Sequence, residues 1–153
     1  MDPDKDQPPD LPTEAREAPQ AWSRGEFERA RDLYRVCVAK AELPGAVLSP
    51  AFYLAEWARQ EAGIGNREAF EDLYRKVFEL EPSAPFWRLS YARDTWTGFN
   101  DGEACAGRIE ELEELLASDR WDRTQDLSPK AYAAKIATLR AWLRGEPGGS
   151  ITP

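Results

Sequence analysis

Apolar side chains recur at intervals of three and four residues through most of this 153-residue chain. One such stripe, between Glu26 and Ala41, consists of Phe27, Ala30, Leu33, Tyr34, Cys37, Val38 and Ala41. This spacing places the side chains on one face of an α-helix, whereas a half-buried strand alternates every second residue. No window shows sustained alternation of that kind. The sequence therefore predicts an all-α fold.

Prolines, glycines and capping residues divide the chain into predicted helices. Six strong helices are expected over about 26–41, 50–63, 66–80, 85–98, 101–116 and 128–144. Pro50 and Pro129 suit first helical positions, and Gly145 can end the last helix. A weaker first helix begins at Thr13, where Pro19 interrupts the pattern, so this helix is expected to be short or broken.

The two ends of the chain differ in composition from the helical part. Residues 1–12 contain four prolines and four aspartates, too few apolar groups to offset the entropy of ordering them. The sequence therefore predicts a disordered acidic tail over 1–12, a helical domain over 13–145 and a flexible C-terminal tail over 146–153.

Two phrases recur within the helical part. Asp32-Leu33-Tyr34-Arg35 returns forty residues later as Asp72-Leu73-Tyr74-Arg75, each after a glycine at the helix entrance, Gly25 or Gly65. At an offset of thirty-four, a second set matches Phe52, Trp57 and Ala58 with Phe86, Tyr91 and Ala92. Matching residues in alternate helices at these offsets favour a stacked helix-turn-helix repeat.

At these residues the chain resembles the tetratricopeptide (TPR) family and its half-a-TPR (HAT) relatives. Residues 51–84 fit one 34-residue TPR unit, with Trp57-Ala58 in its first helix, Gly65-Asn66 in its turn, Leu73-Tyr74 in its second helix and Pro82 near its end. Leu54, Trp57 and Glu61 keep the spacing of the HAT first helix, with leucine in place of the first aromatic residue.

The resemblance covers about residues 22–116. It implies a right-handed α-α superhelix, a TPR-like solenoid of about three helix pairs, with the last helix as a C-terminal cap. The outer units depart from the pattern at Pro19, Arg108 and Glu111, as end units that face water commonly do.

Charge and composition narrow the function. The chain has a net charge of −8 and a pI near 4.7, without the basic stripe that binds a nucleic-acid backbone. It has no apolar run long enough for a membrane span, and its N-terminus is acidic where a secretory signal would be basic. We therefore expect a soluble, cytoplasmic protein that binds neither nucleic acid nor membranes directly.

Catalytic chemistry is not expected. The chain has no histidine, which removes the commonest general base and metal ligand. Cys37 and Cys105 lie among apolar helix residues, as reduced core thiols do. The acids between Glu110 and Glu114 alternate with apolar residues, as on a solvated helix face. The sequence predicts no enzyme activity, no metal site and no cofactor.

The resemblance also implies a binding surface, because first helices line the concave face of a TPR array. The residues predicted to bind a partner there are Phe52, Arg59, Phe86, Leu89, Arg93 and Trp96. Arginine and large aromatic side chains concentrate binding energy at interfaces. The alternative is that the C-terminal helix folds back into this groove and buries its aromatic residues.

The leading hypothesis is a non-catalytic interaction module or adaptor that binds a protein segment, with Arg59 and Arg93 attracting carboxylates. The HAT resemblance suggests an alternative, a scaffold component of an RNA-processing assembly, which would allow a nuclear location. A dedicated chaperone or immunity-type inhibitor is the second alternative. The oligomeric state is left open.

Overall fold

The computed structural model describes residues 11–121 and 127–145, and within these ranges it contains seven helices and no strand. The helices are α1 (Thr13–Ser23), α2 (Phe27–Ala41), α3 (Pro50–Gly63), α4 (Arg67–Leu80), α5 (Pro85–Phe99), α6 (Gly102–Ala117) and α7 (Pro129–Leu143). The all-α prediction is confirmed. Apart from Leu11 and Pro12, the two predicted tails lie outside the described residues.

The helix boundaries follow the capping chemistry of the sequence. The side chains of Asn66, Asp101 and Ser128 each accept a hydrogen bond from a backbone N–H three residues later, at 3.4, 3.0 and 3.1 Å. Each of these bonds satisfies a donor that the first turn of a helix leaves without a partner.

Pro19 does not break α1, which runs as one short helix through this position. Ala18, Ala21 and Trp22 on either side of the proline are buried in the core. We attribute the continuity of the helix to this packing, which offsets the backbone hydrogen bond that a proline cannot donate. The alternative of a broken first helix is therefore wrong, and that of a short helix is confirmed.

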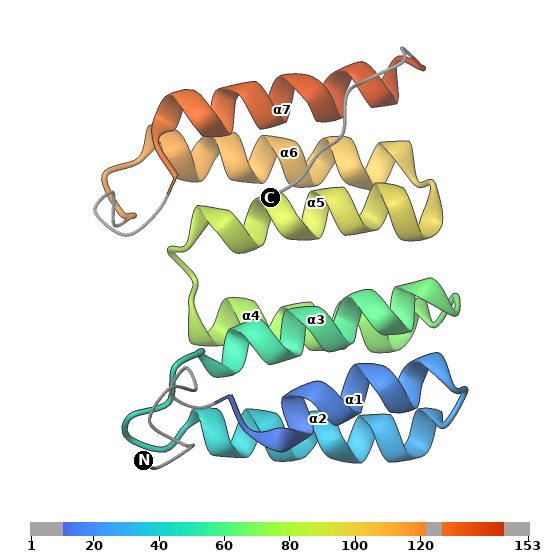
Figure 1. The fold of residues 1–153 in the computed structure, drawn as a ribbon. Helices are drawn as coiled ribbons and strands as arrows, with labels where there is room; N and C mark the ends of the chain where they lie inside the picture. Colours follow the sequence, from blue (N-terminus) through green and yellow to red (C-terminus); the bar gives the residue numbers. More distant parts are fainter. Residues whose placement is uncertain (1–10, 122–126, 146–153) are drawn as a thin grey trace, which may run out of the picture.

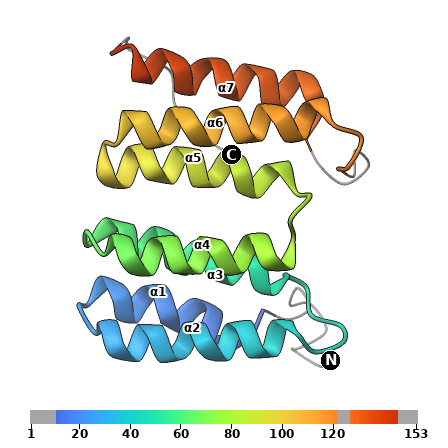
Figure 2. The ribbon, with the colours of Figure 1, turned by 180° about the vertical axis from the view of Figure 1, so that it is seen from behind.

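The helices pair as three antiparallel hairpins, α1 with α2, α3 with α4, and α5 with α6. The hairpins follow one another along the molecule, and α7 lies against α6 at the end of the row (Figures 1 and 2). Helix α3 touches α2 on one side and α5 on the other. No helix in the described part of the chain is both long and apolar enough to cross a membrane.

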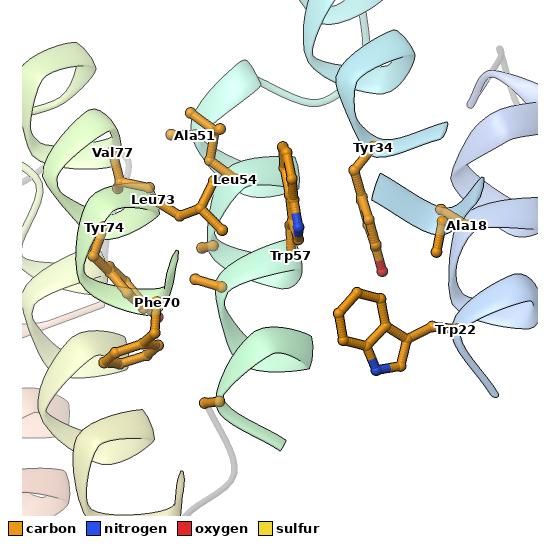
Figure 3. Close-up of a cluster of buried hydrophobic side chains, with 14 of the residues drawn as sticks. Ala18, Trp22, Tyr34, Ala51, Leu54, Trp57, Phe70, Leu73, Tyr74 and Val77 are labelled. Carbon is orange, nitrogen blue, oxygen red and sulfur yellow. The ribbon is translucent and has the colours of Figure 1, made fainter. Parts of the chain in front are cut away.

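The first of two core clusters holds the first two hairpins together. In Figure 3 the ring of Tyr34 from α2 lies between Trp57 of α3 and the α1 residues Ala18 and Trp22. The rings of Tyr34 and Trp57 are stacked, 5.9 Å apart at an interplanar angle of 8°. The second cluster joins α5, α6 and α7 through residues such as Ile109, Leu112 and Tyr132. Cys37 and Cys105 are buried, unpaired thiols, and burial raises the pKa of each to about 11.

Aromatic rings join the second hairpin to the third. The ring of Tyr91 on α5 lies 4.7 to 5.7 Å from the rings of Phe70, Tyr74 and Phe78 on α4. Offset and edge-on ring pairs in this distance range stabilise a fold beyond the area that they bury. Tyr91, one of the residues in the second repeated phrase, is therefore a packing contact between α5 and α4.

Close approach of α3 to α5 requires a glycine. A Cβ atom at Gly98 would lie 2.9 Å from the Cβ of Ala62, a contact that only movement of the backbone relieves. We expect Gly98→Ala to lower the free energy of unfolding by about 1 to 3 kcal/mol, the usual cost of overpacking, although alanine favours helices. Chemical denaturation measures this change.

Gly107 on α6 provides the matched control. It also lies inside a helix, but nothing approaches within 4 Å of the position that its Cβ would occupy. Gly107→Ala should therefore raise the free energy of unfolding by about 0.5 to 1 kcal/mol through helix propensity alone. A gain in stability from both substitutions would contradict the close contact between α3 and α5.

Candidate binding surface on the first helices

The structure places the six predicted binding residues on α3 and α5, but in different environments. Phe52 and Arg59 lie on α3, two turns apart, and both are exposed. On α5, Phe86 is half-buried against the first core cluster. Leu89 is buried in the second core cluster, and Trp96 packs against that cluster together with Leu143 of α7.

Helix α7 lies against α6 at the end of the row, and its relation to the predicted set runs through the second core cluster. Side chains of α7 share a hydrophobic cluster with Leu89 and Trp96. Phe52 and Arg59 belong to α3, and α3 packs mainly against α2, α4 and α5. Within the predicted set, these two residues are the ones that are exposed.

A buried carboxylate organises the two arginines. Asp94 on α5 has only 2% of its surface exposed. The Tyr74 hydroxyl donates to its Oδ2 at 2.6 Å, Arg93 Nε donates to its Oδ1 at 3.2 Å, and Arg59 Nε donates to both oxygens at 3.3 and 3.4 Å. Ser90 completes the group, with its hydroxyl 2.7 Å from that of Tyr74. We call these five residues the Asp94 cluster.

The two arginines have different roles in the Asp94 cluster. Arg93 has 8% of its surface exposed and donates to both Asp94 and Ser90, so it supports the cluster from within. The side chain of Arg59 has half of its surface exposed. Of the two arginines, Arg59 is therefore the one whose side chain is exposed to solvent.

The surroundings raise the pKa of two members of the cluster, Tyr74 and Arg59. Burial, and then the neighbouring charge of Asp94, raise the pKa of Tyr74 well above its ordinary value, so its hydroxyl remains a donor. Burial would lower the pKa of Arg59, but the interactions with Asp94, Tyr74 and Glu56 together outweigh burial and raise the pKa. Arg59 is therefore a permanent cation whose Nε is fixed by Asp94.

Glu56 lies on the same side of α3, one turn before Arg59. Burial raises the pKa of its carboxyl, and the charge of Arg59 partly opposes that effect. The local charge is thus two arginines against two carboxylates. Because a guanidinium has five N–H donors, the exposed end of Arg59 can still donate to an acceptor from outside.

Sequence reasoning missed Asp94 and Ser90, which are the residues that hold Arg59 in place. The available signal was a serine and an aspartate four residues apart in a helix rich in large apolar side chains. Polar residues at that spacing share one helix face, and a buried face must find hydrogen-bond partners for them.

Arg108, which departs from the repeat pattern, also has a structural role. Its guanidinium donates to Glu71 at 2.8 Å and to Thr95 at 2.7 Å, and stacks 4.0 Å above the ring of Tyr91. An ion pair therefore joins α4 to α6 where the pattern would have an apolar contact.

A hollow of about 550 Å³ opens beside Arg108, between α4, α5 and α6. Its lining contains three arginines and three glutamates: Glu71, Arg75, Glu79, Arg88, Arg108 and Glu111. Phe78 and Tyr91 complete the lining. With equal numbers of both charges, this hollow favours neither an acidic nor a basic ligand.

A second hollow, of about 630 Å³, lies between α6 and α7. Leu116, Ala133, Ile136 and Ala137 form its apolar part. The pair Arg140 and Glu113 spans it with a hydrogen bond of 2.8 Å. Neither hollow includes a residue of the predicted binding set.

Comparisons with known proteins found no match to this chain. No protein-family model matches it, and no curated protein or solved structure matches it significantly.

Proposed function

We propose that this chain is a non-catalytic interaction module, a short TPR-like solenoid that binds an acidic segment of a partner protein in its concave face. The partner contacts Phe52 and Arg59 on the exposed side of α3. Recognition is non-covalent, with Phe52 supplying apolar contact area and Arg59 donating hydrogen bonds to a carboxylate. The row of three hairpins and the repeated phrases support the solenoid.

The observation that carries the proposal is the geometry of Arg59. Its Nε is held by the buried carboxylate of Asp94, while half of its side chain faces solvent. A long side chain that is already fixed loses less conformational entropy on binding than a free one. Folding already restricts the Arg59 side chain, so its remaining N–H groups can bind a partner with a smaller loss of conformational entropy.

The neighbouring charges indicate the direction of approach. Glu56 lies one turn before Arg59 on α3 and would repel a carboxylate that came from that side. The acidic group of the partner should therefore reach the solvent-exposed end of Arg59, away from both Glu56 and Asp94. Its apolar group would then lie along α3 towards Phe52.

Peptide selection tests the proposal. Peptides of twelve residues, selected from a random displayed library on the wild-type protein, should be enriched in Asp and Glu. Arg59→Gln should weaken their binding about tenfold, as expected for an interface arginine worth about 1.4 kcal/mol. Arg59→Lys, which keeps the charge, should lose less affinity, and isothermal titration calorimetry measures each affinity.

Arg35→Gln is the matched control, because Arg35 is an exposed arginine of α2 that pairs with an exposed aspartate. It should leave the affinity within twofold of wild type. Arg59→Gln should also remain folded, since Tyr74 and Arg93 still donate to Asp94. Selected peptides that bind the folded Arg59→Gln protein at full strength would place the binding surface elsewhere.

A further inference from the structure

Three residues of α3 form a row along one face of the helix. Phe52, Glu56 and Arg59 are separated by four and then three positions, so their side chains lie on the same face. Phe52 is 39% exposed, half of the Arg59 side chain is exposed, and Glu56 is half-buried. The row therefore presents an apolar group, an anion and a cation, in that order.

Glu56 has no partner for its carboxylate. Most half-buried acids in the described part of the chain pair with a base or a hydroxyl, namely Glu14, Glu71, Asp72, Glu81, Asp101 and Glu113. The exceptions within residues 11–121 and 127–145 are Glu17 and Glu56. Neither hydrogen bond nor ion pair reaches Glu56 there, and the exposed Arg16 of α1 forms no ion pair with it.

The neighbour of opposite charge on the same face does not neutralise Glu56. Arg59 is held on the α5 side of α3, where its Nε donates to Asp94. Glu56 acts on the α2 side, because burial and then the charge of Glu56 raise the pKa of Tyr34 on α2. Burial raises the pKa of Glu56 itself in spite of the charge of Arg59. Its carboxylate is thus partly desolvated without a donor.

A partner that contacts both ends of the row also covers its middle. Glu56 lies between Phe52 and Arg59 along the helix, so a segment that binds these two residues takes water away from Glu56. Removing water from a carboxylate that gains no donor is costly. A wholly acidic segment would also be repelled by it. A cation on the partner removes both penalties.

We propose that the partner segment carries a lysine or arginine that pairs with Glu56, beside the carboxylate that binds Arg59. This inference rests on the proposed function, because all three contacts belong to one face of α3. Glu56 is then a specificity residue, which selects segments of mixed charge against wholly acidic ones.

The geometry of α3 sets the spacing of the two charges on the partner. A helix rises about 1.5 Å per residue, which separates Glu56 from Arg59 by about 4.5 Å along the axis. An extended segment advances about 3.3 Å per residue. The base and the acid of the partner should therefore be one or two positions apart, with the apolar residue that meets Phe52 on the side of the base.

Selection from a random displayed library of twelve-residue peptides tests this order of charges. On the wild-type protein, enriched peptides should carry lysine or arginine one or two positions from an aspartate or glutamate. On the Glu56→Gln protein the enrichment in acids should remain and the neighbouring base should be lost. Acidic peptides without a neighbouring base on wild type would overturn this inference and leave the proposed function standing. Peptides without acids would overturn both.

Calorimetry on the most enriched peptide gives the sign of the Glu56 contact. Glu56→Gln should weaken its binding about fivefold, because an ion pair is lost. The same substitution should strengthen, at least twofold, binding of the peptide whose base is replaced by alanine, because a carboxylate then no longer loses water without a donor. A structural role alone would change both affinities in the same direction, and that result would refute the pairing.

Glu17→Gln is the matched control, since Glu17 is also half-buried and lies on α1, outside the row. It should change both affinities less than twofold. Neither acid has an internal partner to lose in the described part of the chain, so both variants should unfold at a temperature close to that of wild type. Equal effects of Glu17→Gln and Glu56→Gln on the two peptides would also contradict a specific contact at Glu56.

Discussion

Tyr74→Ala should lower the free energy of unfolding by about 3 to 5 kcal/mol, the cost of removing a large aromatic side chain from a core. Tyr74 has no exposed surface, and its ring lies 4.7 to 5.9 Å from those of Phe70, Phe78 and Tyr91. The substitution also takes a donor from Asp94, which stays buried with its charge. Urea denaturation followed by circular dichroism measures the loss.

Tyr74→Phe separates the ring from the hydroxyl. It keeps the ring contacts but removes the hydrogen bonds to Asp94 and Ser90, so we expect a loss of about 1 to 3 kcal/mol. Phe52→Ala is the control for an aromatic residue with 39% of its surface exposed, and it should cost less than about 1.5 kcal/mol. A loss below about 1 kcal/mol for Tyr74→Ala would contradict the packing of α4 on α5.

The repeated phrase explains why the buried tyrosines were predictable. Tyr34 and Tyr74 occupy the same place in Asp-Leu-Tyr-Arg, and both have no exposed surface, as expected for residues that pack between helices. Helical periodicity and proline positions are local properties of a sequence, so the helices could be placed from them.

The surroundings of Arg59 and Arg93 were not predictable in the same way. The resemblance to TPR units predicts both arginines on the inner side of their helices. The exposure of each arginine side chain, however, depends on the distance between neighbouring hairpins. Gly98 and Ala62 bring α3 and α5 close together, and the Asp94 cluster fills the space beside them. The contact between Arg59 and Asp94 joins residues thirty or more positions apart. A stripe of apolar residues within one helix does not predict such a contact.

Arg31→Met should lower the free energy of unfolding by about 3 kcal/mol at pH 7, the scale for removing one partner of a buried ion pair. Arg31 on α2 donates to both oxygens of Glu61 on α3, at 2.8 and 2.9 Å. Glu61 has only 1% of its surface exposed. Without Arg31, its charge would retain Trp57 and Asn66 as donors, at 3.0 and 3.2 Å.

The effect of Arg31→Met should depend on pH. Burial would raise the pKa of Glu61, but the hydrogen bonds from Arg31, Trp57 and Asn66 outweigh it and hold the pKa below its ordinary value of 4.5. A carboxyl with a lowered pKa stabilises the fold above its unfolded pKa, and this contribution is lost as the pH falls through the folded pKa. The difference in stability between wild type and Arg31→Met should therefore be largest near pH 7 and shrink below about pH 4.5.

Two further variants decide whether the ion pair causes the loss. Arg75→Met removes an exposed arginine that pairs with an exposed aspartate, and it should change the free energy of unfolding by less than about 0.5 kcal/mol. Glu61→Gln in the Arg31→Met protein removes the carboxylate charge that has lost its arginine, and the glutamine keeps an acceptor for Trp57. This second substitution should therefore recover part of the lost stability. If the double variant were as unstable as Arg31→Met at every pH, the loss would come from packing of the arginine side chain. The first two hairpins would then be joined by the stacked rings of Tyr34 and Trp57 and their apolar neighbours, with no net contribution from the bridge between Arg31 and Glu61.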